Sequence, residues 1–140
     1  MYNKIIEAVN SQVVPNKDIE VIIPTGTAIQ NLRSSILGDK LTRDGYHLSY
    51  GVGRYTAALM WVKELTGLDI NAVTWKSTST ALSANGEEKF LAIEAVNFAY
   101  KTPLAKTSSH YVNQSNGTPK LDPGWGFVQI SLKDREKLLS

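Results

Sequence analysis

The chain has 140 residues, of which 42% are hydrophobic and 20% charged, which is typical of one globular domain and not of a disordered or fibrous chain. Its net charge of +2 gives no basis for binding nucleic acid or an anionic membrane surface. Because there is no cysteine, disulfides, zinc–thiolate sites and thiol nucleophiles are excluded. No apolar run approaches the roughly 20 residues of a membrane-spanning helix, and the first residues do not form a secretory signal.

The first third of the chain predicts helix, strand, loop and helix in that order. A helix that ends at Pro15 is favoured by five residues at helical spacing, namely Tyr2, Ile5, Ile6, Val9 and Val13. The β-branched run Ile19–Ile23, closed by Pro24, is typical of a buried strand in a parallel sheet. Thr27 and Gln30 have capping-box spacing at the start of a second helix. This order is typical of an α/β layer fold.

Two stronger helices are expected further along the chain. The first runs from Val52 to Thr66, with Gly67 in place to end it. Gly51 and Gly53 at its start indicate a close approach of the backbone to a packed neighbour.

The second helix is expected from Glu87 to Tyr100, with Asn85 and Glu88 as a capping box. Beyond Pro103 the chain becomes polar, with a short strand expected at 125–132 and a helical turn at 134–139. We therefore divide the chain into a domain over residues 1–103 and a turn-rich extension over residues 104–140.

The loop Arg43–Ser49 holds the residues most suggestive of chemistry. Asp44 stands three residues before His47, so the carboxylate can fold back and accept a hydrogen bond from the imidazole Nδ1. The other ring nitrogen, Nε2, is then free to take a proton from a hydroxyl group. The alternative is that Asp44-Gly45 is an ordinary turn and His47 an ordinary surface residue.

The run Val21–Gly67 resembles the C-terminal block of SGNH/GDSL-type hydrolases and, more narrowly, the bacterial DUF4886 family. The resemblance rests on Pro24-Thr25-Gly26, a following helix, and the motif residues Asp44, Gly45, His47, Ser49, Gly53 and Tyr55. It implies the C-terminal part of a three-layer α/β/α, flavodoxin-like SGNH fold. It also implies ester hydrolysis, with Asp44 as the orienting acid and His47 as the general base. An exported bacterial protein is expected on the same ground.

The chain departs from the hydrolase pattern in one important respect. The family nucleophile is a serine in a Gly-Asp-Ser or Gly-Asn-Ser block, and no serine here lies in such a block. We therefore expect a missing N-terminal segment of the same domain to carry the nucleophile, and we expect this chain alone to be inactive. The alternatives are a non-catalytic α/β binding module and a non-functional gene remnant.

Several further residues are candidates for contacts with a small-molecule or carbohydrate ester substrate. Tyr46 and Arg54 are the substrate-binding candidates, while Trp75 and Trp125 could stack on sugar rings or serve only structure. The two histidines lack the spacing of metal ligands, and no nucleotide-binding motif is present, so no metal or cofactor is expected.

Overall fold

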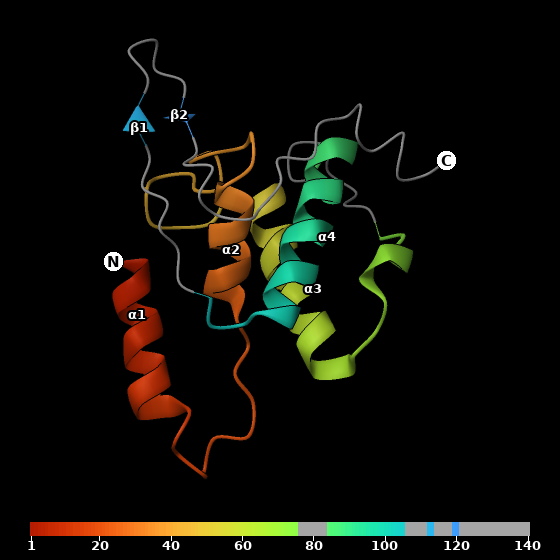
Figure 1. Cartoon of the computed structure of the whole chain (residues 1–140). Helices are drawn as coiled ribbons and strands as arrows, with labels where there is room; N and C mark the ends of the chain where they lie inside the picture. Colours follow the sequence, from red (N-terminus) through yellow and green to blue (C-terminus); the bar gives the residue numbers. More distant parts are fainter. Residues whose placement is uncertain (76–83, 106–111, 114–118, 121–140) are drawn as a thin grey trace.

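The computed structural model describes residues 1–75, 84–105, 112–113 and 119–120, and it is dominated by helices (Figure 1). The elements in chain order are α1 (Tyr2–Ala8), a π-helical turn (Val9–Val13), α2 (Thr25–Arg33), α3 (Val52–Thr66), a 3-10 turn (Ile70–Ala72), α4 (Gly86–Lys101), β1 (Val112–Asn113) and β2 (Pro119–Lys120). Strands β1 and β2 pair antiparallel with each other.

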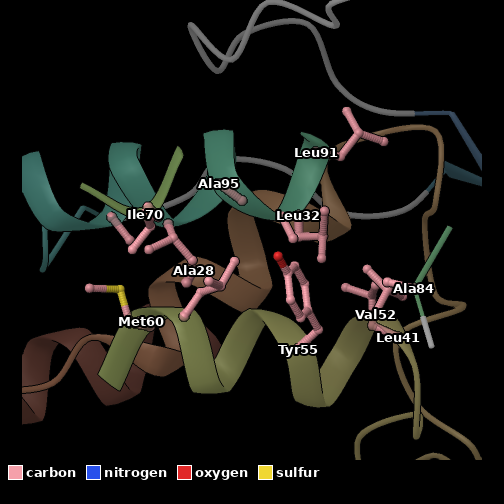
Figure 2. Packing of buried hydrophobic residues seen from close by; sticks show 14 residues of the cluster. Ala28, Leu32, Leu41, Val52, Tyr55, Met60, Ile70, Ala84, Leu91 and Ala95 are labelled. Carbon is pink, nitrogen blue, oxygen red and sulfur yellow. The ribbon is translucent and has the colours of Figure 1, made fainter. Parts of the chain in front are cut away.

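The core lies between α2, α3 and α4, which pack against one another in all three pairings. Each helix supplies fully buried side chains, among them Leu32 of α2, Met60 of α3 and Val96 of α4. Figure 2 shows this core, with Tyr55 of α3 directed toward Leu32. Burial of these apolar surfaces is the main force that holds the three helices together.

Helix α3 has the bounds that the sequence predicts. It runs from Val52 to Thr66 and ends at Gly67, whose φ of 68° places it in the left-handed region that glycine adopts easily. The close approach expected near its start is present at Gly53, where a Cβ would lie 2.5 Å from the carbonyl oxygen of Leu41. This contact presses the loop before α3 against the helix.

Helix α4 begins with the predicted capping box. The Asn85 side chain accepts a hydrogen bond from the Glu88 backbone at 2.9 Å, and the Glu88 carboxylate accepts one from the Asn85 backbone at 2.8 Å. The sequence of α4 predicts a buried side of Phe90, Ile93, Val96 and Tyr100, but Tyr100 is exposed, and the buried residues are Leu91, Ala92, Ala95, Val96 and Ala99. Small side chains let α4 approach α2 and α3 closely.

The predicted α/β/α architecture is wrong for the part of the chain that the structure describes. Residues 19–23, predicted as a buried strand, form no regular element, and Ile19 and Val21 are 41% and 51% exposed. Only Ile23 of this run packs against the core. A strand needs a neighbour to take up its backbone hydrogen bonds, and no described strand lies beside this run.

The start of α2 also differs from the prediction. The helix begins at Thr25 after Pro24, and no side chain caps it. The Thr27 hydroxyl instead donates to the Pro103 carbonyl at 2.6 Å and accepts from the Tyr2 hydroxyl at 2.9 Å. Thr27 therefore joins α2 to both ends of the described domain.

Helix α1 lies to one side of the three-helix core (Figure 1). Tyr2 tethers it to the domain, because its hydroxyl lies 2.9 Å from both the Thr27 hydroxyl oxygen and the Ala105 carbonyl oxygen and can share its one proton between them. Ile6 is buried, whereas Ile5 on the same turn is 52% exposed.

The strand and helical turn expected over 125–139 lie outside the described residues, and the domain boundary at residue 103 stays a prediction.

Candidate active site

The loop between α2 and α3 folds back on itself over residues 42–48. Thr42 and Leu48 form an antiparallel bridge, and the Arg43 backbone N–H donates to the His47 carbonyl at 3.0 Å. Gly45 stands at the tip with φ of 84°, a conformation that favours glycine. The loop therefore brings the residues on either side of Gly45 together.

Asp44 accepts three hydrogen bonds within this turn. Its Oδ1 accepts from the backbone N–H groups of His47 at 2.7 Å and Tyr46 at 3.0 Å, and its Oδ2 lies 2.7 Å from His47 Nδ1. The pKa of Asp44 is lowered to about 2, mainly by the hydrogen bond from the His47 backbone and next by the hydrogen bond from the His47 ring. Asp44 is therefore an anionic acceptor at neutral pH.

The contact between Asp44 and His47 fixes how the imidazole ring is oriented. An ionised carboxylate only accepts hydrogen bonds, so Nδ1 of His47 carries the shared proton. The His47 side chain is 65% exposed, and within the described residues its Nε2 makes no hydrogen bond. With Nδ1 engaged by Asp44, Nε2 is the ring nitrogen left to exchange a proton with a substrate or nucleophile, as general base catalysis requires.

Ser49 and Gly53 hold the turn against the start of α3. The Ser49 backbone N–H donates to the Leu41 carbonyl at 2.8 Å, and the Ser49 hydroxyl accepts from the Gly53 backbone N–H at 3.0 Å. Ser49 therefore acts as a structural acceptor at the start of α3. Leu41, which precedes the turn, is buried in the core.

A pocket of about 430 Å³ lies next to this turn. Residues of α3 from Arg54 to Val62 line it, together with Val73, Trp75 and Ala84 from further along the chain. Tyr50, two residues before α3, is the lining residue closest in sequence to His47. The walls are mostly apolar, and the Tyr55 and Trp75 rings lie nearly parallel, with centroids 6.4 Å apart.

Two arginines connect the turn to the pocket through Tyr50. The Arg43 guanidinium lies over the Tyr50 ring, 4.6 Å from its centroid, and donates to the Tyr50 hydroxyl. It also lies 3.8 Å from the Asp44 carboxylate. The Arg54 guanidinium lies 4.4 Å from the Tyr50 ring centroid. A continuous set of contacts thus runs from Asp44 to the mouth of the pocket.

The structure brings together some of the predicted site residues and separates others. Asp44 and His47 are in contact, and Arg54 and Trp75 both line the pocket. Tyr46 stands at the tip of the turn with 91% of its surface exposed and does not line the pocket. Trp125 and His110 lie outside the described residues.

Sequence reasoning missed the roles of Tyr50 and Val73. A tyrosine between the Asp-x-x-His loop and the next helix was the available signal for Tyr50. Among the residues that the structure describes, no group of His, Asp and Glu side chains is arranged to hold a metal ion. Over the same residues, no helix is long and apolar enough to cross a membrane.

The comparisons with known proteins place this chain in a family. Residues 1–96 match the family model "Domain of unknown function (DUF4886)", so the chain belongs to the DUF4886 family. A DUF4886 family protein from Bacteroides uniformis ATCC 8492, known from a crystal structure, shares 37% sequence identity with it and has a TM-score of 0.66.

That similarity covers 76% of this chain and 39% of the Bacteroides uniformis protein. The chain therefore spans well under half of the length of this relative. No curated protein matches the chain.

Proposed function

We propose that this chain carries the acid–base pair of an SGNH-type ester hydrolase. The observation that carries the proposal is the 2.7 Å contact between His47 Nδ1 and Asp44 Oδ2, with the ring exposed on its other side. The order of residues from Pro24 to Tyr55, which resembles the SGNH/GDSL hydrolases, supports the same assignment.

In the proposed reaction each residue has a separate role. A serine hydroxyl gives its proton to His47 Nε2 as its oxygen attacks the acyl carbonyl carbon of the ester. Asp44 stabilises the imidazolium that forms. The imidazolium then protonates the leaving alcohol, which leaves an acyl-enzyme. Water repeats the sequence, with His47 again taking the proton, and releases the carboxylic acid.

The nucleophile in this proposal comes from polypeptide outside these 140 residues. Ser49, the serine next to the pair, has its hydroxyl occupied as an acceptor for the backbone of α3. No serine of the chain follows Gly-Asp or Gly-Asn. The much greater length of the Bacteroides uniformis relative leaves ample room for such a block in a family member.

A fluorophosphonate probe tests this division of roles, because it reacts covalently with activated serines. We expect this chain alone to remain unlabelled, and we expect the longer Bacteroides uniformis protein to be labelled at one serine outside the region that aligns with this chain. Intact-protein mass spectrometry measures the labelling.

The denatured proteins are the control for non-specific reaction. Labelling of any serine in this chain would show that it holds its own nucleophile. Absence of labelling in the folded relative would contradict a serine mechanism for the family.

A further inference from the structure

The pocket beside α3 has the size of a small-molecule site and an unusual composition for one that would hold a sugar. Its volume of about 430 Å³ lies within the roughly 300–1,000 Å³ of ligand pockets. Among the described residues of the lining, the Tyr50 hydroxyl is already bonded to Arg43, so the Arg54 guanidinium is the main polar group that they offer a ligand. A sugar would leave most of its hydroxyl groups unpaired against this part of the lining.

The apolar part of the pocket is formed by residues of α3 and by Val73, Trp75 and Ala84. Leu59 and Val62 line it from α3, and Val73 and the exposed Trp75 line it from the chain that follows α3. An alkyl chain or a flat apolar group would remove this surface from water. The free energy of binding gains about 25 cal/mol for each Å² of apolar area buried in this way.

The charged end of the pocket selects the polar part of the ligand. Arg43 and Arg54 flank Tyr50, and Asp44, the nearby acid, is already bonded to His47. Lys89 lies 5.7 Å from the centroid of the Tyr55 ring. One cation thus lines the pocket and two more contact the rings of lining residues, an arrangement complementary to a carboxylate or an ester carbonyl at the end of a hydrocarbon chain.

We propose that this pocket binds a medium-chain acyl group, with its carbonyl or carboxylate end at Arg54 and Tyr50. The binding of a fatty carboxylate stands on the pocket alone. The assignment of the acyl group to a substrate rests on the proposed ester hydrolysis, and it makes medium-chain acyl esters better substrates than the acetyl esters of carbohydrates.

Calorimetric titration of this chain with butanoate, hexanoate, octanoate and glucose tests the proposal. We expect each added methylene to tighten binding by up to about fourfold, and we expect no measurable binding of glucose. Ala58→Trp, which fills the pocket from an exposed position on α3, is expected to weaken octanoate binding by about tenfold or more.

Ala8→Trp, at an exposed position of α1 outside the pocket, is the matched control and is expected to leave binding unchanged. Equal octanoate affinity in Ala58→Trp and Ala8→Trp would overturn the proposal, as would affinity independent of chain length. The titration measures binding without ester turnover, so failure of the proposed ester hydrolysis would leave the pocket proposal standing, and the reverse is equally true.

Discussion

If the chain acts in the proposed hydrolase, replacing His47 by alanine in a full-length protein that also carries the nucleophile is expected to lower kcat for p-nitrophenyl ester hydrolysis on the order of 10⁶-fold. The reason is that the serine proton then has no acceptor. Asp44→Asn is expected to cost less, on the order of 10⁴-fold, since the ring remains but loses its anionic partner and its fixed orientation. Steady-state kinetics measure both effects.

Two matched substitutions separate this effect from a general loss of structure. His110→Ala removes the other histidine of the chain. Asp39→Asn removes an exposed carboxylate of the same inter-helix region, which pairs with Arg33 at 2.6 Å. Both are expected to keep kcat within about twofold. Full activity in His47→Ala would remove His47 from catalysis.

Gly53→Ala is expected to lower the free energy of unfolding by about 2–3 kcal/mol. The added Cβ would lie 2.5 Å from the Leu41 carbonyl oxygen and 2.9 Å from the Ser49 hydroxyl. Neither neighbour can yield easily, because the Leu41 oxygen is a backbone atom that accepts from Ser49 and the Ser49 hydroxyl accepts from Gly53 itself. The turn that carries Asp44 and His47 would be displaced. Urea denaturation measures the loss.

Gly86→Ala is the matched control for this substitution. Gly86 is the first residue of α4, and a Cβ there would meet no atom within 4 Å. Stability is expected to stay the same or to rise by up to about 1 kcal/mol, since alanine favours helix. Equal stability of the two variants would show that the close approach at Gly53 is not important for the fold.

The elements that could be predicted from sequence are those whose causes are local. The length of α3 follows from its apolar repeat and from Gly67, and the start of α4 follows from Asn85 and Glu88. The strand at 19–23 could not be judged in this way, since a strand exists only if another strand pairs with it. The β-branched composition of residues 19–23 carries no information on whether a partner strand lies beside them.

The same distinction applies to the site. The contact between Asp44 and His47 closes over three residues, so spacing and Gly45 were enough to anticipate it. The pocket is assembled from segments more than 30 residues apart, between Tyr50 and Ala84, and depends on how α3 packs. Tyr55, Leu59 and Val62 follow the apolar repeat that predicts α3, but the repeat does not indicate that all three line a pocket.

Long-range ¹H–¹⁵N NMR of the His47 ring tests the central claim most directly, because it reports which ring nitrogen holds the proton. At a pH at which the ring is uncharged, the structure predicts a protonated Nδ1 and a bare Nε2, with this preference lost in Asp44→Asn. A proton on Nε2 in the unmodified chain, or a spectrum that Asp44→Asn leaves unchanged, would contradict the acid–base pair.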